Sequence, residues 1–89
     1  MSNVFIALQK NEDSRAIVNA ILADNPTAIV SDQPAMVKID VPGRMVIRKS
    51  TIEEEIGRDF DLQEMHVHLI TLSGNIDETD DEFSLTWNQ

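Results

Sequence analysis

Two histidines that stand one residue apart, His66 and His68, are the side chains in this sequence with the clearest potential for chemistry. On a β-strand they would point to the same side, and metal sites use imidazole pairs at this spacing. Two ligands do not make a site, and the sequence indicates no third. We therefore predict no metal site and no bound cofactor, while a small metal-dependent enzyme that uses His66 and His68 stays an alternative.

Other catalytic and binding motifs are excluded by single positions. Residues 75–86 alternate like the ligands of a calcium loop, but Asp80 stands where that loop needs glycine and Thr86 where it needs glutamate. The three glycines are too far apart for a phosphate-binding loop, and no serine is marked as activated by a histidine and a buried acid. Cysteine is absent, which excludes disulfides, iron–sulfur clusters and thiol nucleophiles. We predict no catalytic residue.

The length and charge of the chain narrow its class further. Its 89 residues suffice for a single domain over residues 1–89 with one modest core. A formal net charge of −9 argues against a nucleic acid ligand. No apolar run approaches the roughly 18 residues that a membrane span needs, and the first residues lack a signal-peptide pattern. We expect a cytoplasmic protein without a membrane partner.

Charged residues are unevenly distributed along the chain. No Lys or Arg follows Arg58, whereas acidic residues are frequent after it. Such a separation could steer the encounter with a partner, or it could simply keep the protein in solution, and the sequence leaves both open. Four of the seven basic residues lie in one central segment, namely Lys38, Arg44, Arg48 and Lys49.

The elements that must position these side chains follow from local patterns. Apolar alternation predicts an opening strand over residues 4–8. Asn11 can cap a helix that ends at Asn25-Pro26, because the residue before proline disfavours helical angles. A short strand is expected over residues 28–30.

The segment over residues 36–57 predicts two strands and a helix. The strands, which we call the central ribbon, flank a bend at Pro42 and Gly43. Thr51 stands three residues before Glu54, which is the spacing of a capping box. We therefore expect a short helix that begins near Ile52 and ends at Gly57.

Residues 65–73 predict a strand with two different faces. One face of that strand would carry Met65, Val67 and Leu69, and the other would carry His66, His68, Ile70 and Leu72. The second face is either a buried face or an exposed recognition strip.

The remaining chain predicts a turn at residues 73–75 and a solvated acidic loop at residues 77–82. Phe83, Leu85 and Trp87 then predict a closing strand that could return along residues 65–72. Phe60 and Trp87 are expected in the core. No internal repeat is evident.

Three stretches resemble a known family over nearly the whole chain: NPTAIV, MVKIDVPGRMVIRKSTIEEEIG and RDFDLQEMHVHLITLSGNIDETDDEFSLTW. They are similar to the small regulatory, or effector, components of bacterial multicomponent monooxygenases, and most of all to phenol hydroxylase regulatory proteins. The resemblance implies an α+β fold, a small domain with antiparallel sheet packed against two to three short helices. It also implies a cofactor-free, non-enzymatic protein.

The partner implied by the resemblance is a separate di-iron hydroxylase, with the reductase of the complex as an indirect partner. The protein would alter how that hydroxylase uses oxygen, electrons and substrate. A generic acidic interaction module stays a further alternative. Carried over by position, the residues that meet the hydroxylase, which we call the contact set, are His66, His68, Ile70, Thr71, Leu72, Ser73, Gly74 and Asn75.

Two members of the contact set depart from the more distant, methane-oxidising relatives. Ile70 and Leu72 stand where those relatives have small polar residues. Both become candidates for the apolar centre of an interface, and the acidic loop and the central ribbon become candidates for its rim.

Overall fold

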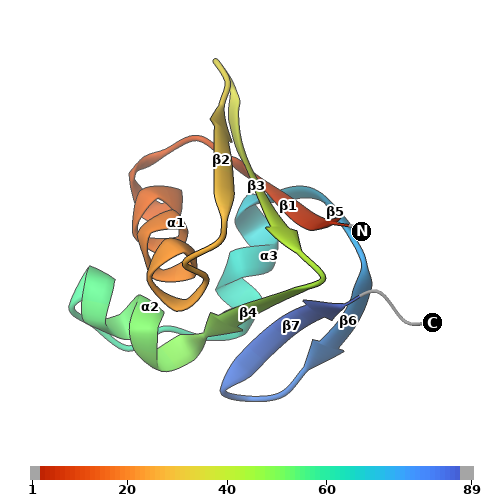
Figure 1. Cartoon of the computed structure of the whole chain (residues 1–89). Coiled ribbons are helices and arrows are strands. Elements are labelled where there is room, and N and C mark those ends of the chain that lie inside the picture. The colour runs from red at the N-terminus through yellow and green to blue at the C-terminus, as the bar shows by residue number, and fades with distance from the viewer. Residues whose placement is uncertain (1–2, 87–89) are drawn as a thin grey trace.

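An amphipathic strand, β1 (Asn3–Gln9), opens the chain and buries Val4, Ile6 and Leu8 completely, as their alternation predicts (Figure 1). This computed structural model describes residues 3–86. The helix α1 (Glu12–Asp24) follows, and Asn11 caps it as expected: its Oδ1 accepts a hydrogen bond from the Ser14 amide at 2.9 Å. The helix ends before Asn25-Pro26, which confirms the predicted end.

Two further strands complete the N-terminal part of the molecule. The predicted short strand is β2 (Ile29–Asp32), and the first strand of the central ribbon is β3 (Met36–Pro42). β3 lies between β2 and β1 and pairs antiparallel with both. Its register places Ile39 opposite Ile6, so that both side chains face the core.

The second strand of the central ribbon, β4 (Arg44–Arg48), exists as predicted but belongs to another sheet. β4 pairs with a strand near the C-terminus and not with β3. Gly43, whose φ is 76°, makes the bend that sends the chain from one sheet into the other. Positive φ favours glycine, which is why the bend falls there.

The next helix, α2 (Lys49–Ile56), ends at Gly57 as predicted but begins earlier than expected. Its N-cap is Arg48, whose side chain makes no capping hydrogen bond, so the predicted capping box of Thr51 and Glu54 is wrong. The Lys49 amide instead donates to the Asp81 carbonyl at 2.9 Å. The start of α2 is therefore stabilised by the Asp81 carbonyl, in a turn distant along the chain, and not by the Thr51 side chain.

The predicted strand over residues 65–73 is half wrong. A 3-10 turn, η1 (Leu62–Glu64), leads into the short helix α3 (Met65–His68), and only then does β5 (Leu69–Ser73) begin. The physical reason is a capping box formed by Asp61 and Glu64. The Asp61 carboxylate accepts from the Gln63 amide at 3.0 Å, and the Glu64 carboxylate accepts from the Asp61 amide at 3.1 Å.

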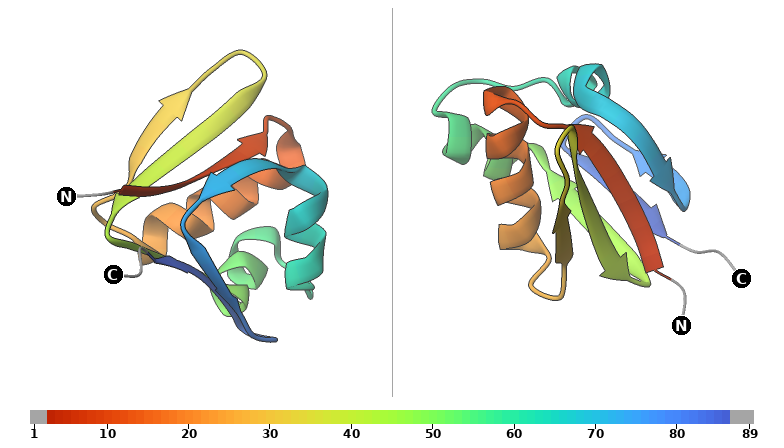
Figure 2. Two further views of the ribbon diagram at one scale, coloured as in Figure 1. Left: turned by 90° about the vertical axis from the view of Figure 1, so that its right-hand side faces the viewer. Right: turned by 90° about the horizontal axis from the view of Figure 1, so that it is seen from above.

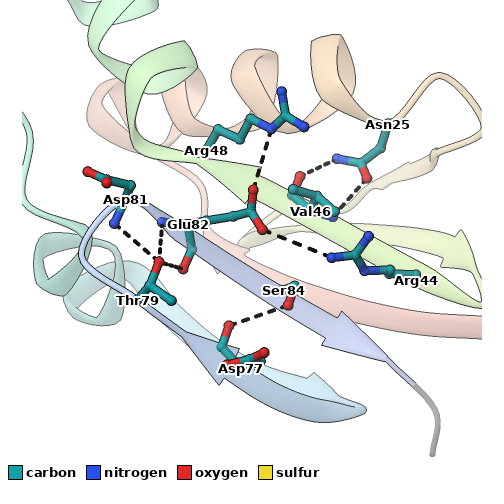
Figure 3. A network of polar contacts seen from close by, with 9 residues as sticks. All are labelled: Asn25, Arg44, Val46, Arg48, Asp77, Thr79, Asp81, Glu82 and Ser84. Atoms are coloured by element: carbon teal, nitrogen blue, oxygen red, sulfur yellow. Dashed lines mark hydrogen bonds and ion pairs between the residues drawn. The ribbon is translucent and has the colours of Figure 1, made fainter.

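The C-terminal strands β6 (Asn75–Glu78) and β7 (Glu82–Thr86) form a hairpin. The expected acidic loop is therefore wrong for residues 77, 78 and 82, which lie in strands, and only residues 79–81 form the turn. Thr79 organises this turn, because its Oγ1 accepts from the Glu82 amide at 3.1 Å (Figure 3). β7 pairs with β4 and β6, so the expected return along residues 65–72 is wrong as well. Trp87 lies outside the described residues.

The described strands form two antiparallel sheets, ordered β2-β3-β1-β5 and β4-β7-β6. Figure 2 shows α1, α2 and α3 on the side where the two sheets face each other. One continuous cluster of buried residues from both sheets and from α1 and α2 forms the core, and Phe60 belongs to it as expected. The α+β class is confirmed, with its strands divided between two sheets. In the described part of the chain, no helix is long and apolar enough to cross a membrane.

Candidate docking surface

The contact set lies on three consecutive pieces of the fold. His66 and His68 belong to α3, the residues from Ile70 to Ser73 form most of β5, and Gly74 and Asn75 carry the chain into β6. β5 is an edge strand of the four-stranded sheet, and β6 is an edge strand of the other sheet (Figure 2). The contact set therefore follows the edges of both sheets and forms a surface strip.

Within this strip the register of β5 decides which side chains are available. Leu72 pairs with Ile6, so it faces the core, is half-buried and packs against the core cluster. Thr71 is exposed, and Ile70 is 47% exposed next to an irregularity in the pairing with β1. Of the two candidates for an apolar centre, Ile70 is accessible to a partner, whereas Leu72 packs against the core.

The short helix exposes an apolar residue, Val67, that a strand would place on the same face as Met65. Val67 is 73% exposed, whereas Met65 is fully buried. The predicted strand face of Met65, Val67 and Leu69 is therefore wrong at Val67. The Asp61 and Glu64 spacing is a signal for a helix start that the alternation of the residues after it obscures. Ile76 on β6 is a further exposed apolar residue at this edge, at 51%.

The two histidines do not share a face, because a helix turns them apart. His66 Nε2 lies 3.4 Å from Glu78 Oε2 on β6, and its ring meets Phe83 edge-on with the centroids 6.0 Å apart. His68 Nδ1 lies 3.2 Å from Asn11 Nδ2, at the start of α1. This geometry gives no support to a metal-dependent enzyme built on His66 and His68. Among residues 3–86, no group of three or more His, Asp and Glu side chains is placed to hold a metal ion.

Gly74 fixes the path of the strip between the two sheets. Its φ is 133°, a backbone conformation that residues other than glycine rarely adopt. A Cβ at this position would lie 2.9 Å from Cγ1 of Val4, which is shorter than any ordinary contact. The turn signal read from residues 73–75 is thus a tight crossing between sheets, with its backbone against β1.

Acidic and basic residues that lie far apart in the sequence are close to each other in the folded structure. Glu82 on β7 lies between Arg44 and Arg48 on β4, with nitrogen–oxygen distances of 4.0 and 3.6 Å (Figure 3). Lys38 lies 3.9 Å from Asp40 and sits over the Phe5 ring, 4.4 Å from its centroid. Much of the basic charge on β3 and β4 is therefore beside carboxylates, which weakens the hypothesis that it steers a partner.

A hollow with a partly apolar lining lies away from the strip. It has a volume of about 410 Å³ and lies between the start of α1 and the hairpin of β2 and β3. Val18, Val30 and Val37 form its apolar part, and an ion pair of 2.7 Å joins Lys10 and Asp32 at its rim. No member of the contact set lines this hollow.

Comparison with known proteins gives one consistent result. The model of the MmoB/DmpM family matches residues 2–86. The stimulatory component DmpM of phenol 2-monooxygenase from Pseudomonas sp. (strain CF600) is 50% identical over 86 residues, which cover 97% of this chain and 96% of that protein.

Solved structures agree with the sequence comparison. Two chains from structures of a phenol hydroxylase–regulatory protein complex match with TM-scores of 0.93 and 0.89 and identities of 48% and 45%. They cover 98% and 97% of this chain, and this chain covers 100% of each of them. The soluble methane monooxygenase regulatory protein B shares the fold, with a TM-score of 0.76 at 23% identity, over 97% of this chain and 65% of that chain.

Proposed function

This chain belongs to the MmoB/DmpM family, and we propose that it is the non-catalytic regulatory component of a phenol hydroxylase. It binds the di-iron hydroxylase of the complex and changes how that enzyme uses oxygen, electrons and substrate, without a cofactor of its own. One observation carries this proposal: a chain 48% identical to this one, which shares its fold over 98% of this chain, comes from a structure of a phenol hydroxylase–regulatory protein complex. We also propose that the chain is one domain that acts in the cytoplasm.

The contact set is the part of the molecule that we propose for docking. Ile70 is its exposed apolar centre, and Thr71, which is also exposed, lies beside it. Val67 and Ile76 extend the accessible apolar surface on either side along the chain. An apolar centre bordered by polar side chains is typical of a protein interface.

Regulation of the hydroxylase follows from differential binding. A partner shifts an equilibrium between two states only by the difference between its affinities for them. The protein therefore favours one arrangement of the hydroxylase active site over another when its surface fits that arrangement better. No residue of this chain needs to touch the substrate.

Reconstitution tests the proposed function directly. Purified hydroxylase and reductase are assayed with phenol, with increasing amounts of this protein, and product formed per NADH consumed is measured. We expect the yield to rise and to saturate, and we expect no turnover by this protein alone. An unchanged yield at saturating amounts would identify a generic acidic module, and turnover by the isolated chain would contradict the proposal.

A substitution at Ile70 tests the docking surface. Ile70→Asp should leave the fold intact, because the side chain is half exposed, and should weaken hydroxylase binding by about 1 to 3 kcal/mol, as expected for a central contact. Calorimetry measures the affinity, and circular dichroism checks the fold. Ile29→Asp is the matched control, since Ile29 is 59% exposed on β2, the opposite edge strand of the same sheet. Equal affinities of the two variants would remove Ile70 from the interface.

A further inference from the structure

The short helix α3 carries two histidines, and their side chains contact different parts of the fold. His66 contacts Glu78 on β6 at 3.4 Å, and Gln63 donates to the same Glu78 oxygen at 3.1 Å. His68, the last residue of α3, contacts Asn11 at the start of α1. β5 begins at the next residue, so both contacts bear on where the proposed docking strand starts.

The orientation of the Asn11 amide is determined by its role as a helix cap. Its Oδ1 accepts a hydrogen bond from the backbone amide of Ser14 at 2.9 Å, and the Ser14 hydroxyl accepts one from the backbone amide of Asn11 at 3.0 Å. The Nδ2 group is therefore the one that faces His68 Nδ1, at 3.2 Å. Because Nδ2 can only donate, Nδ1 must accept, and a neutral His68 must carry its proton on Nε2.

Protonation has opposite consequences for the two histidines. A proton on Nδ1 of His68 would place an N–H group against the Asn11 N–H group and abolish the hydrogen bond. A protonated His66 would instead form an ion pair with the Glu78 carboxylate and strengthen its contact.

Charged groups on the neighbouring elements do not alter this difference. The first turn of α1, against which His68 lies, carries Glu12 and Asp13, but no carboxylate oxygen of the described residues lies within 4 Å of the His68 ring nitrogens. Around His66, η1 carries Glu64, β6 carries Asp77 and Glu78, and β7 carries Glu82. Of these, Glu78 is within 4 Å, whereas Glu64 and Glu82 lie beside arginines.

We propose that Asn11 and His68 position β5 for the hydroxylase, and that a proton on His68 abolishes their contact and weakens docking. The inference rests on the proposed function for its effect on docking, but its structural part concerns this chain alone. Asn11 is a positioning residue that acts through His68. His68 belongs to the contact set and also acts through the strand that follows it.

Nitrogen-15 NMR of the free protein tests the structural part. At pH 8 the ring nitrogens of His68 should show the tautomer that is protonated on Nε2, and Asn11→Ala should allow both tautomers to be populated. A His68 ring protonated on Nδ1 at pH 8 would overturn the proposal. This measurement needs no hydroxylase, so it keeps its meaning even if the proposed function fails.

Binding to the hydroxylase at pH 8 and pH 6 tests the functional part. In His68→Asn, an amide oxygen takes the place of Nδ1 and accepts from Asn11 at both pH values. The wild type should therefore lose affinity relative to His68→Asn on acidification, by about three- to tenfold for one hydrogen bond. At each pH the affinity of the wild type is divided by that of His68→Asn, so that any effect of pH on the hydroxylase itself cancels. A ratio that does not change with pH would overturn the proposal.

Asn11→Asp is the sharper variant, because aspartate caps a helix as well as asparagine does but offers an acceptor to His68. The contact should now form with protonated His68, so the pH dependence should reverse in sign. Asn19→Asp, on an exposed position of α1, adds the same charge elsewhere and should follow the wild type. The proposal fails if the two variants behave alike. If no variant and no wild-type protein binds the hydroxylase, the proposed function has failed and the tautomer measurement alone decides the structural part.

Discussion

The two halves of the molecule share one topology. β1, α1, β2 and β3 form a strand, a helix and a hairpin, and β4, α2, β6 and β7 repeat that order (Figure 1). The strand arrangement is the same as well, β2-β3-β1 in one half and β6-β7-β4 in the other. No repeat is evident in the sequence, so the two halves reach one arrangement with different residues.

The halves differ in how the edge of their first strand is closed. In the N-terminal half, β5 pairs along β1. In the C-terminal half, no described strand pairs with the other edge of β4. The side chain of Asn25 lies there instead: Nδ2 donates to the Val46 carbonyl at 2.7 Å, and Oδ1 accepts from the Val46 amide at 2.9 Å (Figure 3). One asparagine thus pairs with Val46 in the middle of the β4 edge, whereas a whole strand covers the corresponding edge in the other half.

The strand that closes the first edge is part of an insertion. Residues 57–74, which contain η1, α3 and β5, connect α2 to β6, whereas residues 25–28 suffice to connect α1 to β2. The proposed docking surface is therefore an addition to a repeated scaffold. Phe60, Leu62 and Met65 of this connection belong to the core. Its exposed residues can change without loss of that core, which suits them to recognition.

The largest effect is expected where a single side chain closes an edge. Asn25 is 6% exposed and also donates to the Ile21 carbonyl at 2.7 Å, so Asn25→Ala removes a partner from a buried carbonyl of α1 and from partly buried backbone groups of β4. We expect a loss of about 2 to 4 kcal/mol in the free energy of unfolding. Urea denaturation followed by circular dichroism measures it.

Asn19→Ala is the control for this substitution, because Asn19 lies on the exposed side of the same helix and should change the stability by less than about 0.5 kcal/mol. If Asn25→Ala were no more destabilising than Asn19→Ala, the edge of β4 would not depend on Asn25, and the comparison between the two edges would fail.

The two glycine crossings between the sheets sharpen the comparison further. Gly43 and Gly74 both have positive φ, but a Cβ at Gly43 meets nothing within 4 Å, whereas a Cβ at Gly74 meets Val4 at 2.9 Å. Gly43→Ala should cost about 1 kcal/mol for the backbone alone, and Gly74→Ala should cost about 2 to 3 kcal/mol because the overlap is added. Thermal unfolding of both variants tests this order. The reverse order would mean that the insertion is less tightly attached to β1 than its geometry implies.

The N-terminal half could be predicted from sequence because its local signals agree. Alternation marks β1, Asn11 marks the start of α1, and Asn25-Pro26 marks its end. The pairing of strands could not be predicted, because it depends on contacts between distant residues. The central ribbon shows this limit: both strands were recognised, but Gly43 sends them into different sheets.

The family resemblance indicates which positions along the chain form the candidate site, but it does not predict how their side chains are arranged. A period of two favoured a strand from Met65, whereas the Asp61 and Glu64 capping box starts a helix that ends only at His68. That change of element moved Val67 to the surface and separated the histidines. Leu72 is placed against the core by its pairing with Ile6, which no local pattern reveals.

Substitutions at the N-termini of α1 and α2 should have the smallest effects on the free energy of unfolding. Asn11 caps α1 through its side chain, so Asn11→Ala should cost about 1 kcal/mol. α2 receives no side-chain cap, because Asp81 satisfies the Lys49 amide through its backbone, so Thr51→Ala should cost less than about 0.5 kcal/mol. Urea denaturation of both variants distinguishes the two cases. A loss near 1 kcal/mol for Thr51→Ala would mean that Thr51 and Glu54 do cap this helix in solution, and that both halves start their helices in the same way.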